Sequence, residues 1–209
     1  MKQKKIYLIR HGQTDYNKRG MVQGSGIDAP LNEEGYRQAE RFWQAYKDFP
    51  FDKVYTSALQ RTQQSVQKFI DAGIPHVVFE GLNEIHWGHK EGKPFTREEH
   101  DHYLNVVKAW QQGELHVLIE GGESPMDVQK RQQVVLQYLL EEEEGERILI
   151  CMHGRAMRIL LCYMLNYPLQ NMDYFEHDNL CLYELSWTGS MFVVQRFNDR
   201  RHLQPAQNI

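Results

Sequence analysis

The chain has 209 residues, of which 41% are hydrophobic and 25% are charged, and its formal net charge is −4. This composition is typical of a soluble globular protein, and the length fits one domain with a sizeable core. The negative charge argues against broad nucleic-acid binding, and the apolar runs are too short for a membrane span or a signal peptide. Cys151, Cys162 and Cys181 lack metal-ligand spacing, which predicts reduced thiols in a cytoplasmic protein.

The first expected element is a buried strand at residues 6–9, an apolar run that ends in the sequence Arg-His-Gly at residues 10–12. A second strand of this kind, at residues 148–152, ends in His-Gly at residues 153–154. Ligands of open α/β sheets bind beyond the carboxyl ends of the strands. The two endings therefore predict a functional site at one edge of the sheet.

Helices are expected between and after these strands, and this alternation predicts an α/β layered fold. Asn32 has the position of an N-cap for a helix that reaches Tyr46. Ser57 and Gln60 match a capping box, which predicts that Ser57 caps a helix that stops at Gly73. Further strands are expected at residues 53–56, 76–79, 180–187 and 191–197, the last two as a hairpin.

The middle of the chain, from residue 86 to residue 112, predicts a partly helical insertion over the sheet ends. Ser124 then begins a helix, with a proline at N1 and an acidic residue at N3. This helix runs into the acidic tract 141–144, which we expect to face solvent. A last helix is expected at residues 155–165, directly after the second His-Gly sequence.

His11 suits nucleophilic attack on phosphorus, because a neutral imidazole is a good nucleophile near pH 7. Phosphoryl transfer also requires positive charge beside the phosphate oxygens. Arg10 and Arg61 lie next to strand ends, and their guanidinium groups match phosphate oxygens. His153 would add hydrogen bonds from its ring nitrogens. These cations would favour the neutral form of His11.

The leaving group of such a reaction needs an acid, and Glu84 is the carboxyl candidate. Glu80 and Glu91 are nearby alternatives. The histidine pairs 86/89 and 100/102 could suggest a metal, but a cysteine pair or a convincing third ligand is missing from their neighbourhood. We therefore expect neither a metal nor another cofactor.

The whole set of motifs resembles the signature of the histidine phosphatase superfamily, the phosphoglycerate-mutase-like proteins. The similar segments follow in the same order through nearly the whole chain: residues 8–14, Asn17, 23–24, 28–35, 38–39, 57–62, 84–85, 88, 91–92, 122–124 and 153–155. The resemblance implies a single catalytic domain over residues 1–209, with a substrate loop around 86–122. It also implies a three-layer α/β sandwich around a mixed, mostly parallel sheet flanked by helices.

For the site, the resemblance implies that His11 forms a phosphohistidine and that Glu84 protonates the leaving oxygen and later activates water. It further implies a phosphate pocket made of the following residues: Arg10, Asn17, Gln23, Gly24, Arg61, His153 and Gly154. The family uses no metal.

Gln13 and Thr14, together with a short middle segment poor in arginine, resemble the phosphatase branch more than the mutases. The first hypothesis is therefore a phosphatase that hydrolyses small phosphomonoesters. The alternative is a phosphoglycerate mutase, and the remote alternative is a protein that binds phosphorylated ligands without turnover. The natural substrate, any role of the 86–102 histidines in binding it, and the choice between monomer and homodimer stay open at this point.

Overall fold

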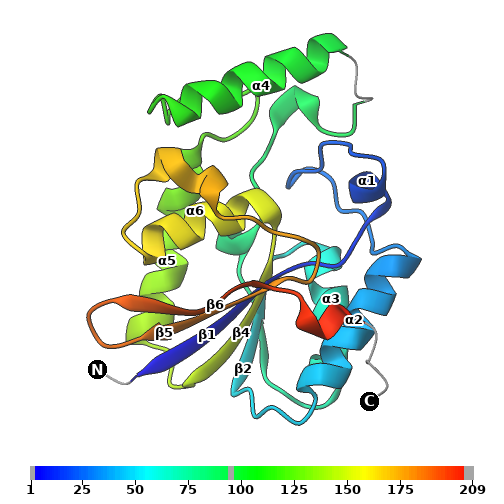
Figure 1. The fold of residues 1–209 in the computed structure, drawn as a ribbon, viewed down its shortest axis with the longest axis vertical. Coiled ribbons are helices and arrows are strands. Elements are labelled where there is room, and N and C mark those ends of the chain that lie inside the picture. The colour runs from blue at the N-terminus through cyan, green and yellow to red at the C-terminus, as the bar shows by residue number, and fades with distance from the viewer. Residues whose placement is uncertain (1–2, 94–96, 205–209) are drawn as a thin grey trace.

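A six-stranded mixed sheet forms the centre of the fold in the computed structural model, which describes residues 3–93 and 97–204 (Figure 1). The strands are β1 (Lys4–Arg10), β2 (Lys53–Thr56), β3 (His76–Val78), β4 (Arg147–Met152), β5 (Leu182–Trp187) and β6 (Phe192–Asp199). Their order across the sheet is β3-β2-β4-β1-β5-β6. The first four strands in this order are parallel, whereas β5 and β6 are antiparallel to their neighbours.

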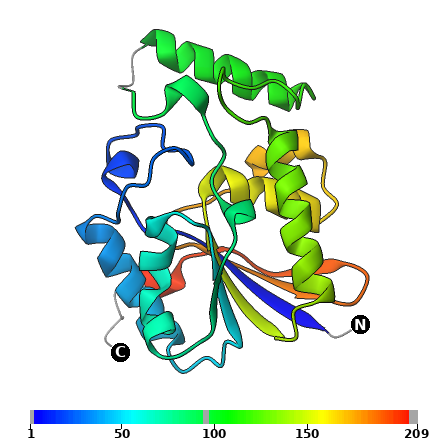
Figure 2. The same cartoon turned by 180° about the vertical axis from the view of Figure 1, so that it is seen from behind.

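Helices cover both faces of this sheet (Figures 1 and 2). The α-helices of the fold are α1 (Asp15–Lys18), α2 (Glu33–Tyr46), α3 (Gln60–Asp71), α4 (Arg97–Gln111), α5 (Pro125–Glu141) and α6 (Gly154–Met164). Helices α2 and α3 lie on one face, α5 and α6 lie on the other, and α4 lies above the carboxyl ends of the parallel strands. Among the described residues, no helix combines the length and the apolar character needed to cross a membrane.

Strand β1 shows why the sheet is covered twice. Its side chains alternate between faces, so Ile6 and Leu8 pack with α5 and α6 while Tyr7 and Ile9 pack with α2 and α3. All four side chains are almost fully buried. A continuous apolar run of this kind is typical of a central strand with helices on both sides. The predicted three-layer α/β sandwich with a mostly parallel sheet is confirmed.

Two of the three predicted helix caps are confirmed and one is wrong. Asn32 and Ser124 accept hydrogen bonds at the starts of α2 and α5, and Ser124 forms a capping box with Asp127. The N-cap of α3 is Leu59, which makes no side-chain capping bond. The Ser57 hydroxyl instead lies between the hydroxyl of Thr62, at 3.0 Å, and a ring nitrogen of His153, at 2.8 Å.

The prediction that the acidic tract 141–144 faces solvent is wrong for Glu143, which is 8% exposed. Its carboxylate accepts hydrogen bonds from the Tyr55 hydroxyl and, at 2.7 Å, from the Lys53 ammonium. The Lys4 ammonium donates to its backbone carbonyl. Burial alone would raise the pKa of Glu143, but the hydrogen bonds from Lys53, Tyr55 and Gly145 outweigh burial and lower it. Glu143 thus joins the ends of β1, β2 and α5.

We expect the Glu143→Ala substitution to lower the free energy of unfolding by about 2–4 kcal/mol, since it leaves buried partners unpaired. Urea unfolding followed by circular dichroism measures this change. Glu142→Ala removes the exposed neighbouring carboxylate and serves as the control, with an expected effect within about 0.5 kcal/mol. Equal effects of the two substitutions would contradict a structural role for Glu143.

Candidate active site

The two predicted histidines lie together because their strands are neighbours. Strand β1 pairs in parallel with β4, and Arg10 at the end of β1 lies opposite Met152 at the end of β4. His11 and His153 are the next residues of each strand, and their ring centroids are 5.1 Å apart. The backbone N–H of His11 also donates to the carbonyl of Met152, at 2.9 Å. The predicted meeting of the two strand ends is therefore present in the structure.

His11 is held as a neutral imidazole with one nitrogen free of the backbone. Its Nδ1 lies 2.7 Å from the carbonyl oxygen of Gly12. Because a carbonyl oxygen only accepts, Nδ1 carries the proton and Nε2 keeps its lone pair. Burial, followed by the nearby Arg61 and Arg10 guanidinium groups, lowers the pKa of His11 well below its usual range. A neutral imidazole with an open Nε2 is the form that attacks an electrophile.

Arg61, the second residue of α3, is fully buried beside these histidines. Its Nε donates to Nδ1 of His153 at 3.2 Å, and its other nitrogens donate to the carbonyls of Ile27 and Gly24. Burial lowers the pKa of Arg61 to about 10, while the carboxylate of Glu84 acts in the opposite direction. Arg61 therefore stays positively charged at neutral pH.

Arg10 provides the second guanidinium. Its Nε is buried and has no hydrogen-bond partner among the described residues. One of its terminal nitrogens lies 3.3 Å from Nδ1 of His177. Burial lowers the pKa of Arg10, and electrostatic interactions with Cys181, Glu84 and Asp178 oppose this shift. A buried cationic donor without a partner is costly, which indicates that an anion completes its hydrogen bonding.

His153 has protein partners on both ring nitrogens. Nδ1 accepts from Arg61, so Nε2 carries the proton and donates to the Ser57 hydroxyl at 2.8 Å. Burial, followed by Arg61 and by His11, lowers the pKa of His153 well below its usual range. His153 is therefore neutral, and a phosphate oxygen would have to compete with Ser57 for its Nε2–H.

Asn17 and Gln23 line a pocket of about 360 Å³ beside Arg10, together with Trp87 and Tyr103. The Nε2 of Gln23 is buried and has no partner among the described residues, whereas its Oε1 accepts from Thr14. The Asn17 side chain is part of the cap of α1. Both amides therefore border the site, and the amide nitrogen of Gln23 can still donate a hydrogen bond to a ligand.

The two predicted glycines have positional roles. The Gly24 carbonyl accepts from Arg61, and a Cβ at Gly24 would lie 1.9 Å from Oε1 of Glu91. Gly154 begins α6, and a Cβ there would lie 2.7 Å from the ring of His177. Both positions exclude larger side chains because neighbouring groups approach the backbone closely.

Glu84 lies against the start of α6, with 7% of its surface exposed. Its Oε1 accepts from the backbone N–H groups of Ile85 and Ala156, and Oε2 accepts from that of Arg155 at 3.1 Å. Each carboxylate oxygen offers two lone pairs, so Oε2 retains one for a reacting group.

The two alternative carboxylates are placed differently. Glu80 is exposed, and Glu91 accepts from the N–H of Trp87 within its own turn. Glu84 therefore fits an acid role best.

His177 and Asn179 are neighbours of the site that the sequence did not indicate. Both belong to the loop before β5, and the Asn179 amide donates to the carbonyl of His11 at 2.9 Å. Burial, with Arg10 as the next cause, lowers the pKa of His177 to about 2. Strand β5 runs antiparallel to β1, so the amino end of β5 meets the carboxyl end of β1. This topology is the one signal that could have pointed to the loop.

Three histidines of the middle segment, His86, His89 and His102, contact one another or their own turn. The rings of His89 and His102 stack at 6.0 Å, and Nδ1 of His86 accepts from the N–H of Gly88. Within residues 3–93 and 97–204, no group of three or more histidine, cysteine, aspartate or glutamate side chains is arranged to hold a metal ion.

Comparison with known proteins agrees with this geometry. The model of the histidine phosphatase superfamily (branch 1) matches residues 6–200. A curated relative from Yersinia pestis, named "Probable phosphoglycerate mutase GpmB", is 31% identical over 207 residues, with 95% of this chain and 94% of the relative covered.

Solved structures with the same fold include two phosphatases. The alpha-ribazole phosphatase of Shigella flexneri is similar with a TM-score of 0.82 and 25% identity, covering 93% of this chain and 96% of that one. The phosphoserine phosphatase of Entamoeba histolytica, solved with 3-phosphoglyceric acid, has a TM-score of 0.82 and 27% identity, covering 96% and 100%. The family model matches almost the whole length of this chain. The chain therefore belongs to the histidine phosphatase superfamily, branch 1, whose phosphatases and mutases act on phosphoesters.

Proposed function

We propose that this protein hydrolyses small phosphomonoesters through a phosphohistidine on His11, without a metal or other cofactor. The observation that carries the proposal is the buried, neutral His11 with Nε2 open, beside an Arg10 guanidinium whose Nε lacks a partner. A phosphoryl group between them would satisfy both the nucleophile and the cation. Three buried free cysteines support a cytoplasmic location as part of the proposal.

In the first step, the Nε2 lone pair of His11 attacks phosphorus while the bond from phosphorus to the leaving oxygen breaks. Arg10 and Arg61 neutralise the charge on the phosphoryl oxygens, which is the main electrostatic requirement of this transition state. Glu84 gives its proton to the leaving oxygen. The product alcohol departs and leaves phospho-His11.

In the second step, water attacks the phosphoryl group and the phosphorus–nitrogen bond breaks. The Glu84 carboxylate accepts a proton from this water, so it ends the cycle protonated as it began. His11 recovers its lone pair on Nε2. The hydrogen bond from Nδ1 to the Gly12 carbonyl keeps the same tautomer ready for the next substrate.

A mutase is the second candidate, because the curated relative at 31% identity carries that name. The pocket beside Arg10 favours hydrolysis instead. Of the described residues that line it, Arg10 is the one cation; the others include Asn17, Trp87 and Tyr103. A phosphoglycerate also presents a carboxylate, which a mutase would have to hold while the phosphoryl group moves.

The products from 3-phosphoglycerate, with a bisphosphoglycerate primer and a metal chelator, separate these candidates. We expect phosphorus NMR to show inorganic phosphate and no build-up of 2-phosphoglycerate. Formation of 2-phosphoglycerate faster than phosphate would identify a mutase. Turnover that stops in the chelator would contradict the metal-independent route.

A further inference from the structure

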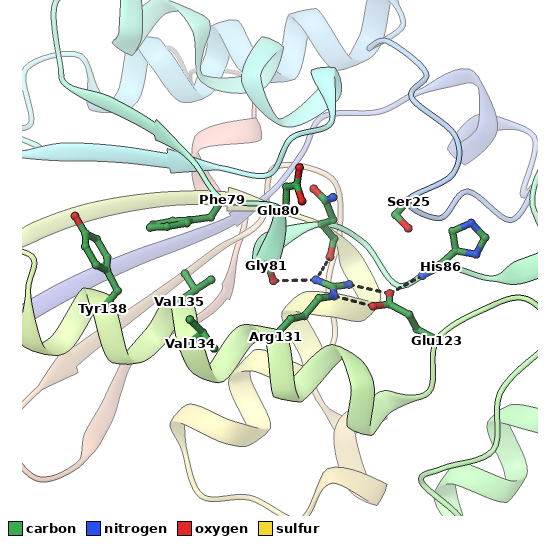
Figure 3. A pocket seen from close by; sticks show the side chains of 11 residues that line it. Ser25, Phe79, Glu80, Gly81, His86, Glu123, Arg131, Val134, Val135 and Tyr138 are labelled. Atoms are coloured by element: carbon green, nitrogen blue, oxygen red, sulfur yellow. Dashed lines mark hydrogen bonds and ion pairs between the residues drawn. The ribbon is translucent and has the colours of Figure 1, made fainter.

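The turn that carries Glu84 is held by one arginine from a different part of the chain, Arg131 of α5 (Figure 3). One terminal nitrogen of Arg131 donates to the carbonyls of Gly81 and Asn83, at 2.8 and 2.9 Å. The other donates to the carbonyl of Glu84 and to the carboxylate of Glu123, both at 3.0 Å. The Nε donates to Glu123 at 2.9 Å. All five guanidinium donors are therefore used.

Glu123 binds the other side of the same turn, at His86. The carboxylate oxygen that accepts from Arg131 also accepts from the backbone N–H of His86, at 2.9 Å. The N–H of Glu123 in turn donates to the carbonyl of His86, at 2.8 Å. Glu84 is therefore fixed from both sides, by Arg131 on its own carbonyl and by Glu123 two residues later.

The turn has close packing at one point and an open space beside it. A Cβ at Gly81 would lie 2.5 Å from the side chain of Val135, so the turn touches α5 there. Next to it lies a pocket of about 800 Å³, bordered by Ser25, His86 and Tyr138 among others (Figure 3). The Arg131 hydrogen bonds thus span the region where the turn borders this pocket.

We infer that Arg131 is a positioning residue for Glu84, and that Arg131 and Glu123 together set where the acid meets the leaving oxygen. The inference rests on the proposed function, in which Glu84 is the general acid. Proton transfer requires the acid within hydrogen-bond distance, and a misplacement of about 1 Å can cost about 10²-fold in rate. Lysine at position 131 would keep the positive charge but could not bind three carbonyls and a carboxylate in the plane of a guanidinium.

The test is the Arg131→Lys variant, with kcat/KM measured on aryl and alkyl phosphate monoesters. The value of kcat/KM depends on the steps from substrate binding to departure of the leaving group. A nitrophenolate leaves without a proton, whereas an alkoxide needs one. We expect a loss of about 10- to 100-fold for alkyl phosphates and less than about 3-fold for p-nitrophenyl phosphate.

Arg147→Lys is the matched control, because Arg147 makes a two-point contact with Asp52 near the opposite end of the sheet. We expect Arg147→Lys to leave kcat/KM unchanged for both types of substrate. Glu123→Gln is a milder second variant, because it removes the negative charge that binds Arg131. It should also lower kcat/KM more for alkyl phosphates than for p-nitrophenyl phosphate. Each variant is measured well below its own unfolding temperature.

Combination with Glu84→Gln distinguishes the inference from the function on which it rests. If Arg131 acts through Glu84, adding Arg131→Lys to Glu84→Gln causes no further loss on alkyl phosphates. A further loss of kcat/KM in the double variant would overturn the positioning role. An equal loss on both substrate types in Arg131→Lys alone would also overturn it. Absence of leaving-group dependence in Glu84→Gln alone would instead overturn the proposed acid.

Discussion

Replacement of His11 by alanine is expected to lower kcat/KM by a factor of about 10⁴ to 10⁶, the range seen when the catalytic residues of a covalent hydrolase are removed. The reason is that the variant lacks the Nε2 lone pair that attacks phosphorus, and the neighbouring histidine cannot replace it. His153 is occupied by Arg61 and Ser57. The cations that remain would still bind the phosphoester, so substrate affinity should change far less than turnover.

The measurement is mass spectrometry of enzyme quenched rapidly during turnover of a chromogenic phosphate ester. Wild-type protein should carry the mass of one phosphoryl group, mapped to His11, and the alanine variant should carry none. His116→Ala removes an exposed histidine and should keep both the adduct and the activity. An adduct that persists in the His11 variant would place the nucleophile elsewhere.

The meeting of His11 and His153 could be predicted from the sequence because it depends on a general property of parallel sheets. Buried strands are visible as apolar runs, and their carboxyl ends meet at one edge. Arg61 followed from the same reasoning, since its helix begins directly after β2. These residues needed no knowledge of side-chain packing.

Ser57 and Glu143 show where local patterns fail. The sequence around Ser57 matches a capping box, but the end of β2 lies beside β4, so His153 offers the Ser57 hydroxyl a partner that a local pattern cannot reveal. Glu143 stands in a run of four acidic residues and looks solvated. Tyr55 and Lys53, both from β2, bind its carboxylate from about ninety positions away. Tertiary partners overrule local propensity in both cases.

Arg131 and His177 were beyond sequence reasoning for the same physical cause. Arg131 is 47 positions from Glu84, and a solvated arginine on an amphipathic helix would have the same spacing. His177 lies 167 positions from Arg10 and has no motif around it. Their contributions depend on contact geometry across the folded chain, which the order of residues does not specify.

Glu84→Gln is expected to lower kcat/KM for alkyl phosphate esters by about 10² to 10⁴-fold, the usual contribution of a general acid. For p-nitrophenyl phosphate the loss should be less than about 10-fold, because this leaving group needs little help from an acid. The same variant lacks the base for the second step, so phospho-His11 should accumulate. Rapid-quench experiments on the aryl ester would then show a burst of product close to one per enzyme, followed by slow turnover.

The controls separate Glu84 from the neighbouring carboxylates. Glu80→Gln removes the exposed carboxylate four residues earlier, and it should change neither the leaving-group dependence nor the burst. The glutamine amide at 84 also faces the N–H of Arg155 with a donor, so a loss of about 1–3 kcal/mol in unfolding free energy is expected and is measured in parallel. Such destabilisation would affect all substrates alike, whereas loss of an acid affects the poor leaving groups first. A uniform loss on aryl and alkyl esters without a burst would therefore assign Glu84 to structure alone, and leaving-group dependence in Glu91→Gln would transfer the acid role to that residue.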